Sequence, residues 1–84
     1  MQSPVLKALA ARIKELRLAK KLSQEELSFR SGLHRTALSL IERGERDPKL
    51  ITLLKVAEKG LGISVAELLG GISLRGSKSK SARG

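Results

Sequence analysis

The chain has 84 residues, of which 40% are apolar, and it contains no cysteine, one histidine and one aromatic residue, Phe29. This length fits one domain. Because the chain has no cysteine and only one histidine, we expect no disulfide, no metal site and no cofactor. Seventeen Lys and Arg against eight Asp and Glu give a net charge of +9, which favours nucleic acid over an anionic membrane as partner.

The apolar residues also limit the class of protein. No apolar run approaches the roughly 20 residues that a bilayer-spanning helix needs, and the N-terminal segment lacks the apolar core of a signal peptide. We therefore expect no membrane partner. A single aromatic residue argues against single-strand binders that stack bases on aromatic rings.

The first predicted helix covers about residues 4 to 20. Ser3 can cap free backbone amides, and Pro4 at the first helical position loses no hydrogen bond. Apolar residues then recur at spacings of three and four, which places them on one face of a helix. These residues are Leu6, Leu9, Ile13 and Leu16.

The second helix is predicted to begin directly after Ser23. Ser23 and Glu26 have the spacing of a capping box, and Leu22 can pack on Leu27 as a hydrophobic staple. Gly32 supplies the left-handed residue that ends a helix without steric cost. We therefore expect a short helix with well-defined ends.

A third helix is predicted over about residues 35 to 43. Leu33 and Leu38 repeat the staple spacing on either side of His34, which lies at the cap position. Gly44 is expected to stop this helix.

The fourth helix is predicted to follow the polar connection of residues 45–48 and to end at Gly60 and Gly62. Its predicted buried stripe consists of Leu50, Leu53, Leu54 and Ala57. Ser64 and Glu67 form a second capping box, which predicts a last helix of one to two turns over about residues 65–70.

Residues 75–84, RGSKSKSARG, carry four positive charges and no acid among small polar residues. Such a segment cannot bury enough apolar surface to order itself, so it is predicted to be a disordered tail after a domain of residues 1–74. The predicted domain keeps a charge of +5 without this tail.

Two helices with a glycine turn between them in residues 23–44 form the helix-turn-helix pattern, whose second helix enters the DNA major groove. Residues 16–69 closely resemble the Cro and phage-repressor type of this domain, through LSQEEL, SGLHRTALSLIERG and PKLITLLKVAEKGLGISVAELL. The resemblance implies an all-α five-helix bundle. Within that group the chain looks most like the small controller proteins of restriction-modification systems, which are stand-alone dimers of about this length.

The resemblance implies base contacts from the recognition helix and the loop after it. An arginine can bond guanine O6 and N7 together, a threonine offers a methyl and a hydroxyl, and a leucine can contact only apolar groups such as the thymine methyl. The implied base-contacting residues are Arg35, Thr36, Ser39, Leu40 and Arg46.

The resemblance also implies that Gln24, at the first position of the second helix, bonds a DNA phosphate. Ser23 beside it leaves backbone amides at a helix N-terminus, which favours anions. The predicted phosphate contacts are Ser23, Gln24, His34, Arg43 and Lys49. The alternatives are a solvated charge for Arg35, a helix former at the first position for Gln24, and surface hydroxyls for Thr36 and Ser39.

Arg17 and Glu42 match an arginine and a glutamate that pair across the first and third helices in the family, so we interpret them as a structural ion pair.

The sequence departs from the family pattern at two places. Ser28 and Ser31 lie where the family prefers small apolar residues, which predicts a looser contact or hydroxyls bonded back to the helix. The run of residues 58–62, EKGLG, is one residue longer than the common spacing, which leaves the register of the last helix open.

One recognition helix contacts few bases, so we expect symmetric pairing onto two half-sites about 34 Å apart. Apolar residues near the end of the sequence exceed what a small bundle needs. The predicted two-fold interface consists of Leu61, Ile63, Val65, Leu69 and Ile72.

The favoured function is a sequence-specific, homodimeric transcription regulator that binds a palindromic operator in double-stranded DNA, its own promoter included. RNA polymerase is a candidate further partner, and the expected location is the cytoplasm, on the nucleoid. The alternatives are an antitoxin-like or adaptor module that binds a protein partner, and sequence-independent DNA binding. An enzyme is disfavoured because the sequence contains no Ser-His-Asp, metal or phosphate-loop arrangement.

Overall fold

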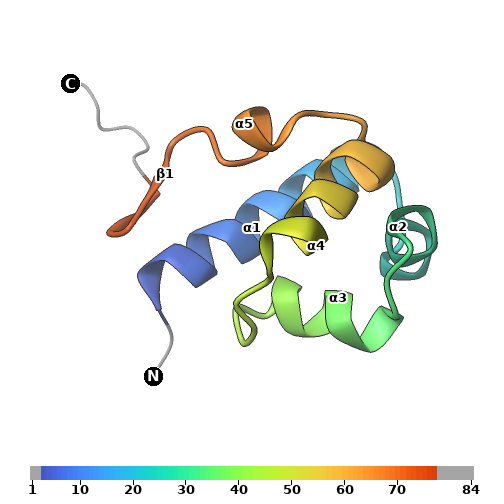
Figure 1. Ribbon diagram of the computed structural model, residues 1–84, viewed down its shortest axis with the longest axis horizontal. Coiled ribbons are helices and arrows are strands. Elements are labelled where there is room, and N and C mark those ends of the chain that lie inside the picture. Colours follow the sequence, from blue (N-terminus) through green and yellow to red (C-terminus); the bar gives the residue numbers. More distant parts are fainter. Residues whose placement is uncertain (1–2, 78–84) are drawn as a thin grey trace.

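Five α-helices, a π-helical segment and a two-stranded hairpin make up the computed structural model, which describes residues 3–77 (Figure 1). The helices are α1 (Pro4–Ala19), α2 (Gln24–Ser31), α3 (Arg35–Glu42), α4 (Leu50–Leu54), its π-helical continuation η1 (Lys55–Leu61) and α5 (Val65–Leu68). The strands are β1 (Ile72–Ser73) and β2 (Gly76–Ser77). The predicted five-helix bundle is confirmed, and the hairpin is an addition to it.

The predicted starts of the first two helices are confirmed by their caps. The Ser3 hydroxyl accepts a hydrogen bond from the Leu6 amide at 3.4 Å. The Ser23 hydroxyl accepts from the Glu26 amide at 2.9 Å, and the Glu26 carboxylate accepts from the Ser23 amide at 2.7 Å. Both arms of the predicted capping box are therefore formed.

The core lies where α1, α2, α3, η1 and α5 meet. In Figure 1, α3 lies at the bottom of the molecule and α5 at the top, while the hairpin projects at the left. Each fully buried Leu or Ile contributes about 1.5 to 3 kcal/mol through removal of apolar surface from water. The core residues are Leu9, Ile13, Leu22, Leu27, Leu38, Ile41, Val56, Ala57, Leu61 and Leu68.

The predicted buried stripe of the fourth helix is wrong at its start, because Leu50 is 65% exposed. Only five residues of α4 precede η1, whose wider π turns change the angle between successive side chains. The buried positions therefore shift along the chain. They are Val56, Ala57, Gly60 and Leu61. We interpret the π turns as the place where the additional residue of the run 58–62 is accommodated.

Gly60 does not end the helix as predicted but lies buried inside η1, and Gly62, with a φ of 72°, ends it. A Cβ built on Gly60 would lie 2.6 Å from Leu27 Cδ1 and would also overlap the Ser31 hydroxyl. The absence of a side chain therefore lets α2 and η1 pack closely. Ser31 Oγ is buried in this contact and has no hydrogen-bond partner among residues 3–77. Ser28 Oγ donates back to the Glu25 carbonyl at 2.9 Å, which is one of the two predicted alternatives.

α5 is shorter than predicted, ending at Leu68 rather than near residue 70. The Ser64 hydroxyl accepts from the Glu67 amide at 3.0 Å, so the serine arm of the second capping box is formed. Arg12 in α1 donates to the Leu68 carbonyl at 3.2 Å and to the Glu67 carbonyl at 3.1 Å. The Leu68 carbonyl lies at the end of the helix, where no intrahelical partner is available, whereas the Glu67 carbonyl also accepts from the Gly70 amide.

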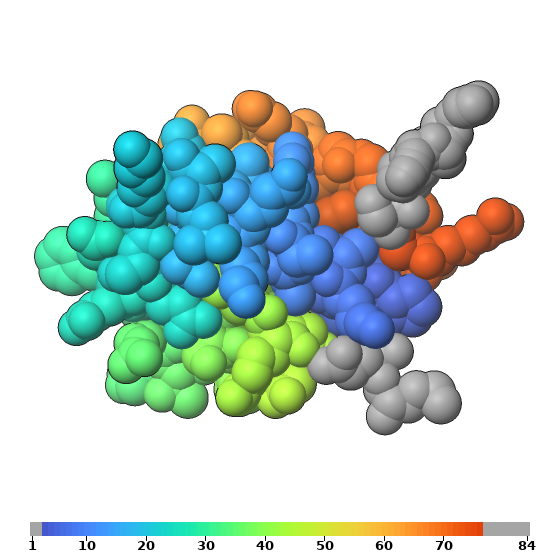
Figure 2. Space-filling view, turned by 180° about the vertical axis from the view of Figure 1, so that it is seen from behind, coloured from blue at the N-terminus to red at the C-terminus, as the bar shows by residue number. Residues whose placement is uncertain are grey.

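The predicted boundary at residue 74 is wrong, because residues 75–77 belong to the hairpin. Antiparallel pairing joins Ile72 to Ser77 and Ser73 to Gly76. Gly76 is buried with a φ of 115°, and a Cβ there would lie 3.3 Å from the Pro4 carbonyl oxygen. The hairpin projects beside the start of α1 (Figure 2). The rest of the predicted tail, residues 78–84, lies outside the described residues.

Among residues 3–77, no helix is both long enough and apolar enough to cross a membrane.

Candidate nucleic-acid interface

A tight turn joins α2 to α3. Gly32 adopts the left-handed conformation, with a φ of 72°. The Gly32 amide donates to the Phe29 carbonyl at 3.2 Å, and the Leu33 amide donates to the Ser28 carbonyl at 2.9 Å. These bonds satisfy the last carbonyls of α2, and a side chain at residue 32 would be strained in this conformation. The turn fixes the direction in which α3 leaves α2.

α3 has one buried face and one exposed face. Its buried residues are Leu38, Ile41 and Glu42. Arg35 and Thr36 in the first turn are exposed, and Ser39 and Leu40 are half-buried. Arg35 and Thr36 are therefore accessible to a ligand, while Ser39 and Leu40 offer less surface.

His34 caps α3, as predicted. Its Nδ1 accepts a hydrogen bond from the Thr36 amide at 3.1 Å. A ring nitrogen that accepts carries no proton, so the neutral imidazole holds its proton on Nε2. The predicted phosphate contact of His34 would therefore have to use this Nε2–H.

The loop after α3 lies beside the recognition helix. A groove of about 410 Å³ separates them, lined by Leu33, Ala37, Ile41, Arg46, Asp47, Pro48, Lys49 and Thr52. Arg46 and Lys49 are exposed at this groove, so the structure brings these two predicted DNA contacts next to α3. Arg43 is also exposed, and it pairs with Glu45 at 3.4 Å.

The N-terminus of α2 holds the other predicted phosphate contacts, Ser23 and Gln24. The Ser23 hydroxyl oxygen already accepts the cap hydrogen bond from the Glu26 amide. The hydrogen of this hydroxyl can still be donated. Within the described part of the chain, no hydrogen bond uses the backbone amides of Gln24 or Glu25. The backbone amide of Ser23, and then its hydroxyl, hold the pKa of the Glu26 carboxyl below its ordinary value.

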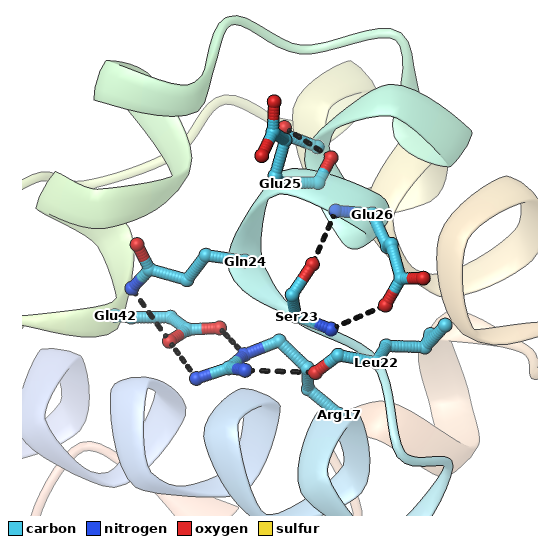
Figure 3. Close-up of polar contacts among 8 residues, drawn as sticks. Arg17, Leu22, Ser23, Gln24, Glu25, Glu26 and Glu42 are labelled. Carbon is cyan, nitrogen blue, oxygen red and sulfur yellow. Dashed lines mark hydrogen bonds and ion pairs between the residues drawn. The ribbon is translucent and has the colours of Figure 1, made fainter.

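The predicted Arg17–Glu42 ion pair is confirmed and is buried (Figure 3). Arg17 Nε donates to Glu42 Oε2 at 2.7 Å, and a terminal guanidinium nitrogen donates to Oε1 at 3.1 Å. The other terminal nitrogen donates to the Leu22 carbonyl at 2.9 Å. One arginine of α1 therefore ties the end of α3 to the loop that precedes α2.

A contact that the sequence did not predict joins this pair to α2. The side-chain amide nitrogen of Gln24 donates to Glu42 Oε1 at 3.0 Å. The two residues are 18 positions apart, and neither spacing nor periodicity relates them. The predicted phosphate contact of Gln24 therefore involves a side chain that already has a protein partner.

The predicted interface set requires a correction. Leu61 is 1% exposed and belongs to the monomer's own core, so its assignment to an interface is wrong. The other members, Ile63, Val65, Leu69 and Ile72, are half-buried against that core. Leu50, which was predicted to be buried, is exposed, as are Ile51 and Leu74.

A family model described as helix-turn-helix matches residues 13–68. The chain is similar to the control protein C.SmaI of Serratia marcescens, with 46% identity over 61 residues that cover 73% of this chain and 71% of that protein.

Two solved controller proteins have similar folds. The chain resembles the restriction-modification controller protein C.AhdI from Aeromonas hydrophila with a TM-score of 0.71 and 44% identity, over 75% of this chain and 94% of that one. It resembles the C.Esp1396I controller protein, a tetramer in complex with its natural 35 base-pair operator, with a TM-score of 0.74 and 35% identity, over 81% and 88% of the two chains.

Proposed function

The chain belongs to the helix-turn-helix family, and on that premise we propose that it is a sequence-specific DNA-binding transcription regulator whose α3 enters the major groove. One observation carries the proposal. The first turn of α3 is exposed and bears Arg35 and Thr36, in a fold shared with a controller protein that binds its operator.

Base readout is assigned to the exposed side of α3 and to the loop beside it. Arg35 bonds guanine O6 and N7, and Thr36 contacts a thymine methyl or a base edge. Ser39 and Leu40 make smaller contacts, as their partial burial allows. Arg46 reaches the DNA from the far side of the groove next to α3.

Phosphate contacts hold the helix in register on the DNA. The N-terminus of α2 supplies Ser23 and Gln24, and the start of α3 supplies the Nε2–H of His34. Arg43 and Lys49 add positive charge at the other end of α3, where neutralising phosphates releases counterions.

The regulator acts as a homodimer on a palindromic operator and controls its own promoter. Exposed apolar side chains on one helix support pairing, since Leu50 is 65% exposed and Ile51 is 64% exposed. We assign these two residues to the interface in place of Leu61. The half-buried Ile63, Val65, Leu69 and Ile72 complete the proposed interface. RNA polymerase is the partner through which such a dimer would act at a promoter in the cytoplasm.

Selection of bound duplexes from a pool of random sequence tests this function. We expect enrichment of a palindromic site, and a large affinity ratio between that site and random duplex that persists over a series of salt concentrations. Binding through phosphates alone weakens with salt but gives no such ratio. A pool that stays random after selection would contradict the proposal.

A further inference from the structure

The side chain of Gln24 is anchored to the buried ion pair of the bundle. Glu42 Oε1 accepts from the Gln24 amide nitrogen at 3.0 Å and from Arg17 at 3.1 Å, while Oε2 accepts from Arg17 at 2.7 Å. The Glu42 side chain is only 2% exposed, whereas Gln24 is half-buried. Gln24 therefore reaches from the surface of α2 to a carboxylate that faces away from water.

This contact fixes which way the Gln24 amide points. An ionised carboxylate only accepts hydrogen bonds, so the amide must turn its nitrogen, not its oxygen, toward Glu42. Figure 3 shows this arrangement, with the amide oxygen directed away from the pair. The nitrogen carries two hydrogens, and Glu42 occupies one of them. The second hydrogen is held in a defined direction by the same bond.

We propose that the Arg17–Glu42 pair positions Gln24 for its contact with a DNA phosphate, in addition to stabilising the bundle. This inference rests on the proposed function. A glutamine on a helix surface samples many rotamers and loses that freedom on binding. The bond to Glu42 removes most of this freedom before DNA arrives. Because Glu42 is part of α3, the same bond ties the phosphate contact of α2 to the placement of the recognition helix.

The competing interpretation is that the pair only stabilises the fold. The variant R17M/E42L separates the two, because well-packed apolar residues can replace a buried ion pair without loss of stability. This variant keeps Gln24 but removes its anchor. Q24A keeps the ion pair but removes the contact.

The test combines these variants with DNA in which one phosphate at a time is replaced by a neutral methylphosphonate, in the duplex that the wild type selects. For the wild type, one such replacement near α2 should weaken binding about tenfold, since a hydrogen bond to a charged group is lost. Q24A should not respond to that replacement. R17M/E42L, confirmed as folded by circular dichroism, should also lose the response.

Lys49 provides the matched control. Replacing the phosphate that Lys49 contacts should weaken binding of R17M/E42L as much as binding of the wild type. A full response of R17M/E42L at the Gln24 phosphate would show that the pair is only structural and would overturn the inference. A wild type that selects no duplex would overturn the proposed function, and the inference with it.

A measurement on the wild type alone keeps the inference falsifiable if R17M/E42L does not fold. The side-chain amide of Gln24 should be as restricted as the helix backbone by NMR relaxation in the protein without DNA. The chain contains one other glutamine, Gln2. The side-chain amide signal that disappears in Q24A therefore belongs to Gln24. A Gln24 amide that moves freely before DNA binds would overturn the inference.

Discussion

Gly60 shows how closely α2 and η1 approach each other. Its Cα faces Leu27 and Ser31, and there is no space for a methyl group between them. The buried Ser31 hydroxyl, which has no hydrogen-bond partner in the part of the chain that the structure describes, belongs to the same contact. A single small residue thus decides how near η1 can lie to the first helix of the helix-turn-helix unit.

Gly60→Ala should therefore lower the free energy of unfolding by about 1 to 3 kcal/mol, the usual cost of overpacking a core. Urea denaturation followed by circular dichroism measures this. Gly70→Ala is the matched control, because a Cβ at Gly70 would have its nearest neighbour, the Glu67 carbonyl oxygen, at 3.5 Å. Equal stability of the two variants would contradict this description of the contact.

At the scale of the elements, caps determine where α2 and α3 begin, and hence which side chains face outward. The Glu26 carboxylate accepts the Ser23 amide at 2.7 Å and closes the capping box of α2. At the start of α3, His34 Nδ1 accepts the cap hydrogen bond from the Thr36 amide. Both bonds are local, so their effects can be tested without disturbing the core.

The lowered pKa of Glu26 predicts how the cap responds to pH. Its cause is first the backbone bond from Ser23, then the Ser23 hydroxyl. A carboxyl group whose pKa is lowered by folding stabilises the folded state above its ordinary pKa of 4.5, and this stabilisation is lost as the pH falls through the lowered value.

Thermal unfolding of the wild type and Glu26→Gln over a pH series checks this expectation. The wild type should have the higher melting temperature at neutral pH, and the difference should shrink at acid pH, where the wild-type carboxyl is protonated. A difference that stays constant with pH would mean that the carboxylate of Glu26 does not act through its charge.

The elements also show which features the sequence could predict. Helix starts at Ser3, Ser23 and His34 were predictable because a cap depends on residues within three positions of each other. The π turns of η1 were not, because they depend on how η1 packs against α2. Leu50 was predicted to be buried and Leu61 to lie in an interface, whereas Leu50 is exposed and Leu61 belongs to the core.

The candidate site also contains features that the sequence could predict and features that it could not. The family resemblance identified the Arg17–Glu42 pair and the exposed Arg35, because all three residues lie within residues 16–69, the part that resembles the family. The bond from Gln24 to Glu42 was not predictable, since it depends on the crossing of α2 and α3. The hairpin could not be predicted, because strands of two residues are too short to show an alternation of apolar and polar residues in the sequence.

At the scale of the whole molecule, a small basic protein exposes large apolar side chains that its own core does not cover. Leu50 and Ile51 are neighbours at the start of α4, and both are about two-thirds exposed. The proposed palindromic operator requires a two-fold partner, and we assign this surface to that contact.

Leu50→Glu combined with Ile51→Glu should convert a dimer into a monomer, because the interface would then bury unpaired charges. Size-exclusion chromatography with light scattering at micromolar concentration measures the mass. Leu18→Glu is the matched control, since Leu18 is 56% exposed on α1 and lies outside the proposed interface. A wild type that is strictly monomeric at this concentration would refute the proposed homodimer.

The proposed function assigns the reading of DNA sequence to Arg35 of α3, and site selection by Arg35→Ala beside the wild type tests this assignment. Arg75→Ala, which removes an exposed arginine from the hairpin, controls for the loss of charge. Arg35→Ala should lose the preference for guanine at one position of each half-site, a discrimination of about 1 to 3 kcal/mol, while Arg75→Ala should keep it. Selection of the same sites by Arg35→Ala, with unchanged preference at every position, would show that Arg35 does not read the sequence.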